Sequence, residues 1–146
     1  MKSLPDTEKN IDARDERGTS PLIFAVERGH TEIVEMLVKA NANVDIQNMY
    51  GDTALIDAAS GSHKEIVEML VKANANVDTQ SNHGNTALIH ATRIGHKEIV
   101  EMLVKANANV DIQGNYGTAL SQAQRHGYRQ VANILLREMG SVGTSH

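Results

Sequence analysis

The clearest pattern of apolar and polar positions in this chain is a stretch that occurs three times. EIVEMLVKANANVD fills residues 32–45, 65–78 and 98–111 without any difference between the copies. The stretch opens as an amphipathic helix whose apolar residues cover more than one stripe: Ile33, Val34, Met36, Leu37 and Val38 in the first copy. We therefore predict a helix that is buried on two sides. One side can pack within its own unit, whereas the other needs a neighbouring unit, as in a solenoid.

A shorter apolar run precedes each copy, and the two are separated by a Gly-His or Ser-His break. The runs are GTSPLIFAV, GDTALIDAA and GNTALIHAT, and a fourth run, GTALSQAQ, precedes the divergent stretch YRQVANILLREMG. Their glycines, Gly18, Gly51, Gly84 and Gly117, are spaced by 33 residues. The pattern predicts two short helices in each unit of a repeat with this period.

Local signals agree with two helices per unit. Each first helix is preceded by a hydroxyl residue that can cap it, and Pro21 suits the first helical position. The capping residues are Ser20, Thr53, Thr86 and Thr118. Before the second helix, SHKE predicts a capping box from Ser62 to Glu65, with Gly29 and Gly95 at the same cap position in other units.

The second helices carry further signals within them and at their ends. Asparagine is expected to end each of them in a left-handed conformation, at Asn41, Asn74 and Asn107. Acid–base pairs in the favoured order are expected to stabilise them slightly, at Glu35–Lys39, Glu68–Lys72 and Glu101–Lys105.

The period and the motifs resemble the ankyrin repeat. In that family a finger loop with a glycine leads to a Thr-Pro-Leu-His helix start, a Gly-His turn, a Glu-Ile-Val helix and a Gly-Ala-Asp-Val-Asn exit. The second unit reads GDTALIDAASGSHKEIVEMLVKANANVD, and the resemblance covers roughly residues 10–139. Pro of the helix start is kept only at Pro21, and Ile23, Ile56, Ile89 and Ser121 replace its His.

The resemblance implies an all-α ankyrin-repeat solenoid of stacked helix-turn-helix units with finger loops. The expected segments are a tail with the end of a partial repeat at 1–13, repeats at 14–46, 47–79 and 80–112, a capping repeat at 113–139 and a frayed tail at 140–146. Residues 1–9 would be either a makeshift cap or the remainder of a longer array.

Composition excludes several classes of protein. The formal net charge is −4 and no face carries a Lys/Arg cluster, which argues against nucleic acid and membrane surfaces as partners. No apolar run approaches the roughly 18 residues of a spanning helix, and MKSLPDTEKN does not resemble a signal peptide. The chain has no cysteine, so it has no disulfide framework, and we expect an intracellular (cytoplasmic) location.

The differences between the units fall on the finger loops and first helices, which the resemblance implies form the concave, partner-binding face. The implied partner-binding residues are Arg14, Glu16 and Arg17 in the first unit, Met49, Tyr50, Asp52 and Ser60 in the second, Asn82, His83, Asn85, Arg93 and Ile94 in the third, and Asn115, Tyr116 and Arg125 in the fourth.

Six of these residues are expected to anchor a patch centred on units two to four, because Tyr, Arg and Met are enriched at interface cores. They are Met49, Tyr50, His83, Arg93, Ile94 and Tyr116, of which Ile94 is expected to be exposed. An alternative stays open at this point: exposed loops vary freely, and a fingertip tyrosine can simply pack on the neighbouring finger.

The sequence offers little for metal binding or catalysis. His30, His63 and His96 occur once per unit, too far apart to share a zinc ion, and are expected to form hydrogen bonds at the turns between helices. His83 and His90 lie seven residues apart with no second pair of ligands. Asp57 and His90 occupy equivalent positions, where an inter-unit hydrogen bond is expected. We predict no catalytic residues, no metal and no cofactor.

The sequence therefore favours a non-catalytic protein–protein interaction module that binds a protein or peptide through its concave face. The alternatives are a structural spacer, or a designed or reconstructed array without an evolved partner, and an enzyme with an unrecognised pocket. We expect a monomer, with end-to-end association through the terminal repeats as the other arrangement.

Overall fold

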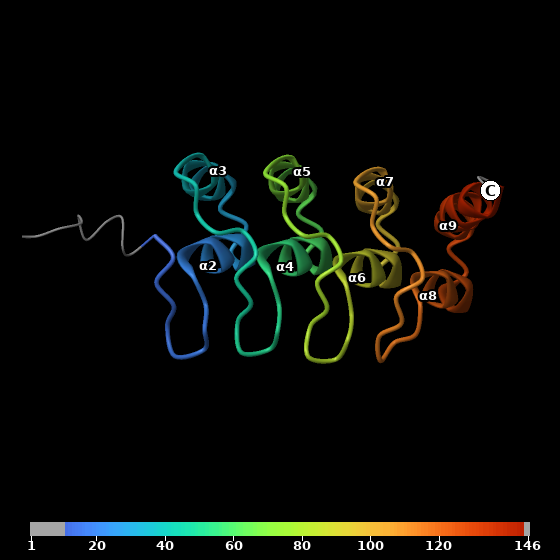
Figure 1. Ribbon diagram of the computed structural model, residues 1–146, viewed down its shortest axis with the longest axis horizontal. Helices are drawn as coiled ribbons and strands as arrows, with labels where there is room; N and C mark the ends of the chain where they lie inside the picture. Colours follow the sequence, from blue (N-terminus) through green and yellow to red (C-terminus); the bar gives the residue numbers. More distant parts are fainter. Residues whose placement is uncertain (1–10, 145–146) are drawn as a thin grey trace, which may run out of the picture.

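The computed structural model describes residues 11–144, and within that range the chain forms eight helices and no strand. The inner layer contains α2 (Pro21–Glu27), α4 (Ala54–Ser60), α6 (Ala87–Arg93) and α8 (Ala119–His126). The outer layer contains α3 (Thr31–Lys39), α5 (Lys64–Lys72), α7 (Lys97–Lys105) and α9 (Arg129–Thr144). Figure 1 shows the two rows, with long loops projecting from the inner row on the side away from the outer one. This is the predicted all-α repeat solenoid.

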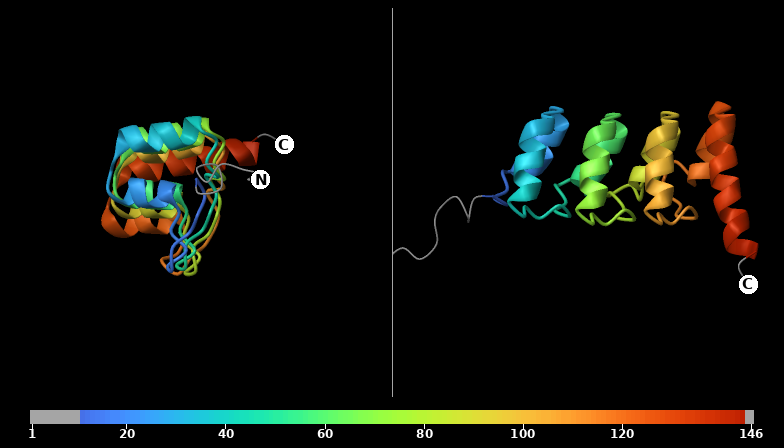
Figure 2. Two further views of the ribbon diagram at one scale, coloured as in Figure 1. Left: turned by 90° about the vertical axis from the view of Figure 1, so that its left-hand side faces the viewer. Right: turned by 90° about the horizontal axis from the view of Figure 1, so that it is seen from above.

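The loops before α2, α4, α6 and α8 are called fingers 1 to 4, with residues 14–19, 47–52, 80–85 and 113–117. Seen along the array in Figure 2, the fingers superpose and extend away from the stacked helices. Each inner helix packs on the next one and on the outer helix of its own unit. The fingers and the inner helices therefore enclose a corner that runs along the whole array.

The predicted caps of the inner helices are confirmed. The hydroxyl oxygens of Ser20, Thr53 and Thr86 each accept a hydrogen bond from the backbone N–H three residues later, at 3.2 Å, and Thr118 does so at 3.1 Å. Pro21 occupies the first turn of α2, where its missing N–H has no partner to lose. Asparagine ends the first three outer helices with positive φ, at Asn41 (66°), Asn74 (65°) and Asn107 (68°), as predicted.

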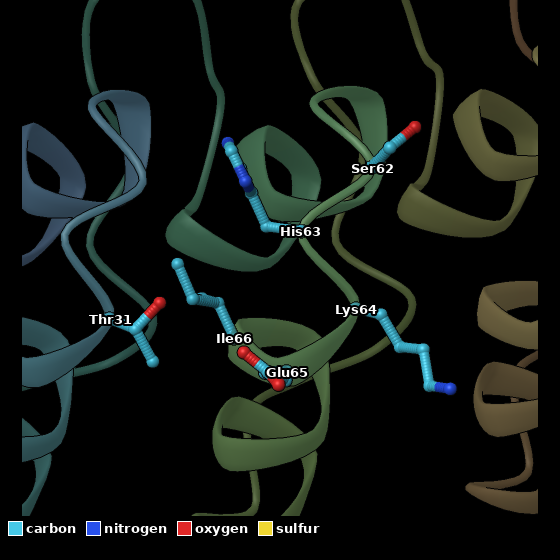
Figure 3. Close-up of a pocket in the computed structure, with 6 residues that line it drawn as sticks. All are labelled: Thr31, Ser62, His63, Lys64, Glu65 and Ile66. Atoms are coloured by element: carbon cyan, nitrogen blue, oxygen red, sulfur yellow. The ribbon is translucent and has the colours of Figure 1, made fainter.

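The predicted capping box at Ser62 is wrong. Helix α5 begins at Lys64 with His63 as its N-cap, and Ser62 adopts a left-handed φ of 62°. Figure 3 shows the Ser62 side chain directed away from the first turn of α5. Gly29 and Gly95 have the same left-handed backbone, so they do not cap their helices either. This position is needed to reverse the chain between the helices, which turns its side chain away from the free N–H groups.

The histidines at the turns have a more limited role than predicted. His30, His63 and His96 are the N-cap residues of α3, α5 and α7. Only His96 caps its helix by a side-chain hydrogen bond, in which Nδ1 accepts from the Ile99 N–H at 3.4 Å. In the second unit, the His63 ring packs so closely on Gly29 of the first that a Cβ there would lie 3.0 Å from it.

Stacking between units is visible in identical residues at different places in the array. Ile33 on α3 is 45% exposed, whereas its counterparts Ile66 and Ile99 are 1% and 0% exposed. Ile66 points towards the preceding unit in Figure 3, beside Thr31. The same helix sequence is thus buried on both sides only where a unit precedes it, which confirms the prediction from its apolar pattern.

Aspartates at the ends of successive units link the units to one another. At three successive boundaries an aspartate oxygen accepts a hydrogen bond from a backbone N–H of the next unit: Asp12 from Asn43 at 2.9 Å, Asp45 from Asn76 at 2.8 Å and Asp78 from Asn109 at 2.8 Å. These bonds fix the spacing of successive units.

Two of the three predicted ion pairs along the outer helices form, Glu35–Lys39 and Glu68–Lys72, both at 3.5 Å and exposed. Surface pairs of this kind contribute little stability.

Two further features of the helices are the length of α9, which differs from expectation, and a buried hydroxyl group on α6. Helix α9 continues to Thr144, so the prediction of a frayed tail from residue 140 is wrong for 140–144. A glycine inside a helix costs only about 1 kcal/mol relative to alanine, so Gly140 does not have to end α9. On α6, Thr92 is fully buried and its hydroxyl has no hydrogen-bond partner.

Candidate functional site

The fingers are held together by their backbones. Each finger donates one N–H to a carbonyl of the preceding finger: Met49 to Arg17 at 2.7 Å, Asn82 to Tyr50 at 3.0 Å and Asn115 to His83 at 2.9 Å. The approach is close enough that a Cβ on Gly51, whose φ is 78°, would lie 2.7 Å from the Asn82 nitrogen. Because the bonds use only main-chain atoms, the side chains at the fingertips can differ between units without disturbing the stack.

A groove of about 270 Å³ lies between fingers 2 and 3 and the inner helices α4 and α6. It collects side chains from three units, among them Tyr50, Asp52, Ser60, His83, His90 and Tyr116. Ile56, which is buried in α4, contributes to its floor. The groove is therefore amphipathic, because aromatic rings from fingers 2 and 4, the Asp52 carboxylate and the apolar side chain of Ile56 all line it.

Three predicted anchor residues are exposed at or near this groove. Tyr50 is 54% exposed and Met49 is 56% exposed at the tip of finger 2, and Ile94, at the end of α6, is 39% exposed. The prediction that Ile94 is exposed is confirmed. Met49 and Tyr50 are adjacent in the chain and both exposed, and neighbouring exposed apolar side chains are typical of a contact surface.

Tyr116 differs from the expectation of an exposed fingertip. It is half-buried and packs against the core, and the Arg93 guanidinium lies 4.4 Å from the centre of its ring. His90 meets the same ring edge-on at a centroid distance of 6.1 Å. Tyr116 and Arg93 thus form one stacked pair that closes the C-terminal end of the groove.

Several predicted contact residues are occupied in holding the fingers. Asn85 is only 2% exposed, and its Nδ2 donates to Oδ1 of Asn115 at 2.7 Å. The Asn82 Nδ2 donates to the Met49 carbonyl at 2.8 Å, and the Arg14 Nη2 donates to the Gln47 carbonyl at 2.8 Å. Asn85 in particular is turned into the protein, so its role in this structure is to position finger 4.

The remaining predicted residues are dispersed. Glu16 and Arg17 on finger 1 and Arg125 on α8 are exposed and do not line the groove. The structure therefore brings together the residues of units two to four and leaves those of the first unit and of α8 apart.

One row of residues on the inner helices was recognised only in part from the sequence. Phe24, Asp57, His90 and Gln122 each lie four residues after the cap of an inner helix, and the sequence analysis named Asp57 and His90 only as a structural pair. Phe24 is 48% exposed, and the Arg28 guanidinium stacks on its ring at 4.4 Å. A different residue occupies this position in every unit, and that variation was a signal available in the sequence.

Asp57 is the most perturbed ionisable group in the described residues. Burial, followed by the negative charges of Asp52 and Glu27, raises its pKa from 3.8 to about 7. Its Oδ2 is fully buried without a hydrogen-bond partner, so the expected bond to His90 is not formed. Burial also raises the pKa of Asp52, with a further contribution from Glu27, while burial and then Arg93 lower the pKa of His90.

The groove contains no metal-binding arrangement within residues 11–144: no group of three or more His, Asp or Glu side chains in that range could hold an ion. His83 and His90 both line the groove but have no further ligands with them. In the same part of the chain, no helix is both long and apolar enough to cross a membrane.

Comparison with known protein families identifies the repeats. A family model described as ankyrin repeats (3 copies) matches residues 1–81 and 73–145, which together span almost the whole chain. No curated protein matches the chain.

Proposed function

Because the chain belongs to the ankyrin-repeat family, we propose that it is a non-catalytic module that binds a protein partner through the concave face formed by its fingers and inner helices. Ankyrin repeats generally mediate protein–protein interaction and are typically non-catalytic. The partner-binding part of this face is the groove between fingers 2 and 3. We include an intracellular location in the proposal, since the chain has no cysteine to stabilise it outside the cell.

The observation that carries the proposal is the exposure of Met49 and Tyr50 beside the groove. Both side chains are more than half exposed, at 56% and 54%, although neither is needed for the backbone bonds between fingers. Exposed aromatic and methionine side chains beside a hollow are the groups that contribute most to binding when a partner desolvates them.

A library of displayed random peptides, selected on the folded chain, tests the proposal. Selected peptides should lose affinity by about tenfold or more when Tyr50→Ala or Met49→Ala is introduced. Met36→Ala is a matched control, because Met36 is 67% exposed on the outer helix α3 and lies away from the groove.

A structural spacer would give a different result. It would yield no peptide whose binding depends on the groove, or only peptides that respond equally to Met36→Ala and Met49→Ala. Either result would overturn the proposed function.

A further inference from the structure

Three carboxylates gather where α2, finger 2 and α4 meet. They are Glu27 at the end of α2, Asp52 on finger 2 and Asp57 on α4. Asp52 directly precedes the Thr53 cap of α4, Asp57 lies in the first turn of that helix, and α2, which ends at Glu27, packs on α4. None of the three belongs to an ion pair within 4.0 Å in the described chain, where the pairs found all involve the outer helices.

The nearby cations are directed elsewhere. Arg28 stacks on Phe24 and Arg93 stacks on Tyr116, each with its guanidinium 4.4 Å from the ring centre. On finger 1, the Arg14 Nη2 donates to the Gln47 carbonyl at 2.8 Å. These arginines therefore form no ion pair with Glu27, Asp52 or Asp57.

An aromatic surface lies beside these carboxylates. Tyr50 is 54% exposed and borders the same groove as Asp52. A carboxylate next to an open aromatic face suits a guanidinium or ammonium group, which gains a charge-assisted hydrogen bond and a cation–π contact. The aliphatic part of the same side chain can cover the apolar floor at Ile56.

We infer that the partner presents a basic side chain, arginine or lysine, which enters the groove between Tyr50 and Asp52 and pairs with the Asp52 carboxylate, while the charge of Asp57 on α4 adds to the attraction. This inference rests on the proposed function and adds the charge of the partner to it. The partner is a protein segment with a cation flanked by apolar residues, since Tyr50 and Ile56 line the groove beside Asp52. Binding of this kind weakens as salt screens the charges.

The burial of Asp57 is consistent with a binding role. A half-buried carboxylate without a hydrogen-bond partner destabilises the free protein, and groups with such strongly perturbed environments occur preferentially at functional sites. The other residues of its row, Phe24, His90 and Gln122, show that the fold does not require an acid at this position.

An array of short peptides tests the inference. Each peptide has one fixed central residue, Arg, Lys, Gln or Glu, in random flanking sequence. The folded chain should retain Arg and Lys peptides and not the matched Gln and Glu peptides. The double variant Asp52→Asn/Asp57→Asn should weaken retention of the basic peptides by about ten- to hundredfold, as expected for lost charge-assisted bonds.

The control variant is Glu65→Gln/Glu68→Gln, which removes the same charge from the exposed face of α5. It should change retention by less than about twofold at moderate salt, where distant exposed charges are screened. Circular dichroism should show that both double variants are folded.

The outcomes separate the two proposals. Peptides that depend on Tyr50 but show no preference for Arg or Lys would overturn the inference and leave the proposed function in place. Equal losses in the two double variants would also overturn it, because they would indicate a general effect of net charge. Peptides that do not respond to Tyr50→Ala would contradict the proposed function itself.

Discussion

Replacing Asp57 by asparagine should stabilise the folded chain in a way that depends on pH. Burial and the charges of Asp52 and Glu27 raise the pKa of Asp57 from 3.8 to about 7. One pKa unit corresponds to about 1.4 kcal/mol, so the ionised carboxylate destabilises the fold by about 4 kcal/mol at high pH. Asparagine has nearly the same shape and no charge, and it removes this contribution.

The direction of this pH dependence follows from the order in which the unfolded and folded states release the Asp57 proton. Below pH 3.8 the carboxyl group is protonated in both states, and its charge has no effect on stability. Between 3.8 and about 7 the unfolded chain releases the proton first, so the free energy of unfolding falls as pH rises. Above that range the loss is complete and constant.

Urea denaturation followed by circular dichroism, at a series of pH values, measures the effect. The difference in free energy of unfolding between Asp57→Asn and the wild type should be smallest near pH 4. It should grow to about 4 kcal/mol by pH 8, with most of the change below pH 7. Other titrating groups are present in both proteins and largely cancel in the difference.

A difference that stays constant across this pH range would refute the reasoning, because it would mean that Asp57 titrates normally in the folded chain. Glu68→Gln serves as the control. Glu68 is exposed on α5 and pairs with Lys72 at 3.5 Å. Its substitution should alter the free energy of unfolding by less than about 1 kcal/mol at any pH.

Four further predictions concern stability and use the same denaturation assay. Ile66→Ala should destabilise the chain by about 2–5 kcal/mol, whereas Ile33→Ala, in the same local sequence but half exposed, should cost less than about 1 kcal/mol; equal losses would contradict the stacking argument. Ser62→Gly should stabilise by up to about 1 kcal/mol, because glycine adopts the left-handed backbone without strain, and a loss would show that the serine side chain is needed. Thr92→Val should stabilise by about 1–2 kcal/mol by removing an unpaired buried hydroxyl, and a loss would imply that the hydroxyl has a partner. His90→Gln should raise the free energy of unfolding, relative to the wild type, more at pH 5 than at pH 8, because burial lowers the pKa of His90 and disfavours its protonated form in the folded state. An equal effect of the substitution at the two pH values would contradict this.

Much of the fold follows from local chemistry that one sequence displays. Hydroxyl caps such as Thr53 and left-handed ends such as Asn74 depend on residues within a few positions, and both are confirmed. The capping box at Ser62 failed because the motif was interpreted alone. Gly29 and Gly95 at the same position of other units already indicated a left-handed turn, where a serine cannot reach the free N–H groups.

The groove was predicted less completely than the fold. The exposure of Ile94 could be predicted because the position lies at a helix end on the variable face. The burial of Asn85 could not, since it results from a hydrogen bond to Asn115 of the next finger. Asp57 was recognised only as a structural residue, because burial, followed by the charges of Asp52 and Glu27, raises its pKa, and the sequence does not show how deeply this side chain is buried.

The main-chain hydrogen bonds between fingers separate architecture from specificity in this chain. Each bond uses a peptide N–H and a peptide carbonyl, so an exchange of the residues at positions such as 50 or 83 leaves the bond intact. Asn82 and Asn85 are exceptions, because their side chains hold neighbouring fingers by hydrogen bonds. At positions 50 and 83 a new ligand preference can arise one repeat at a time while the spacing of the units stays the same.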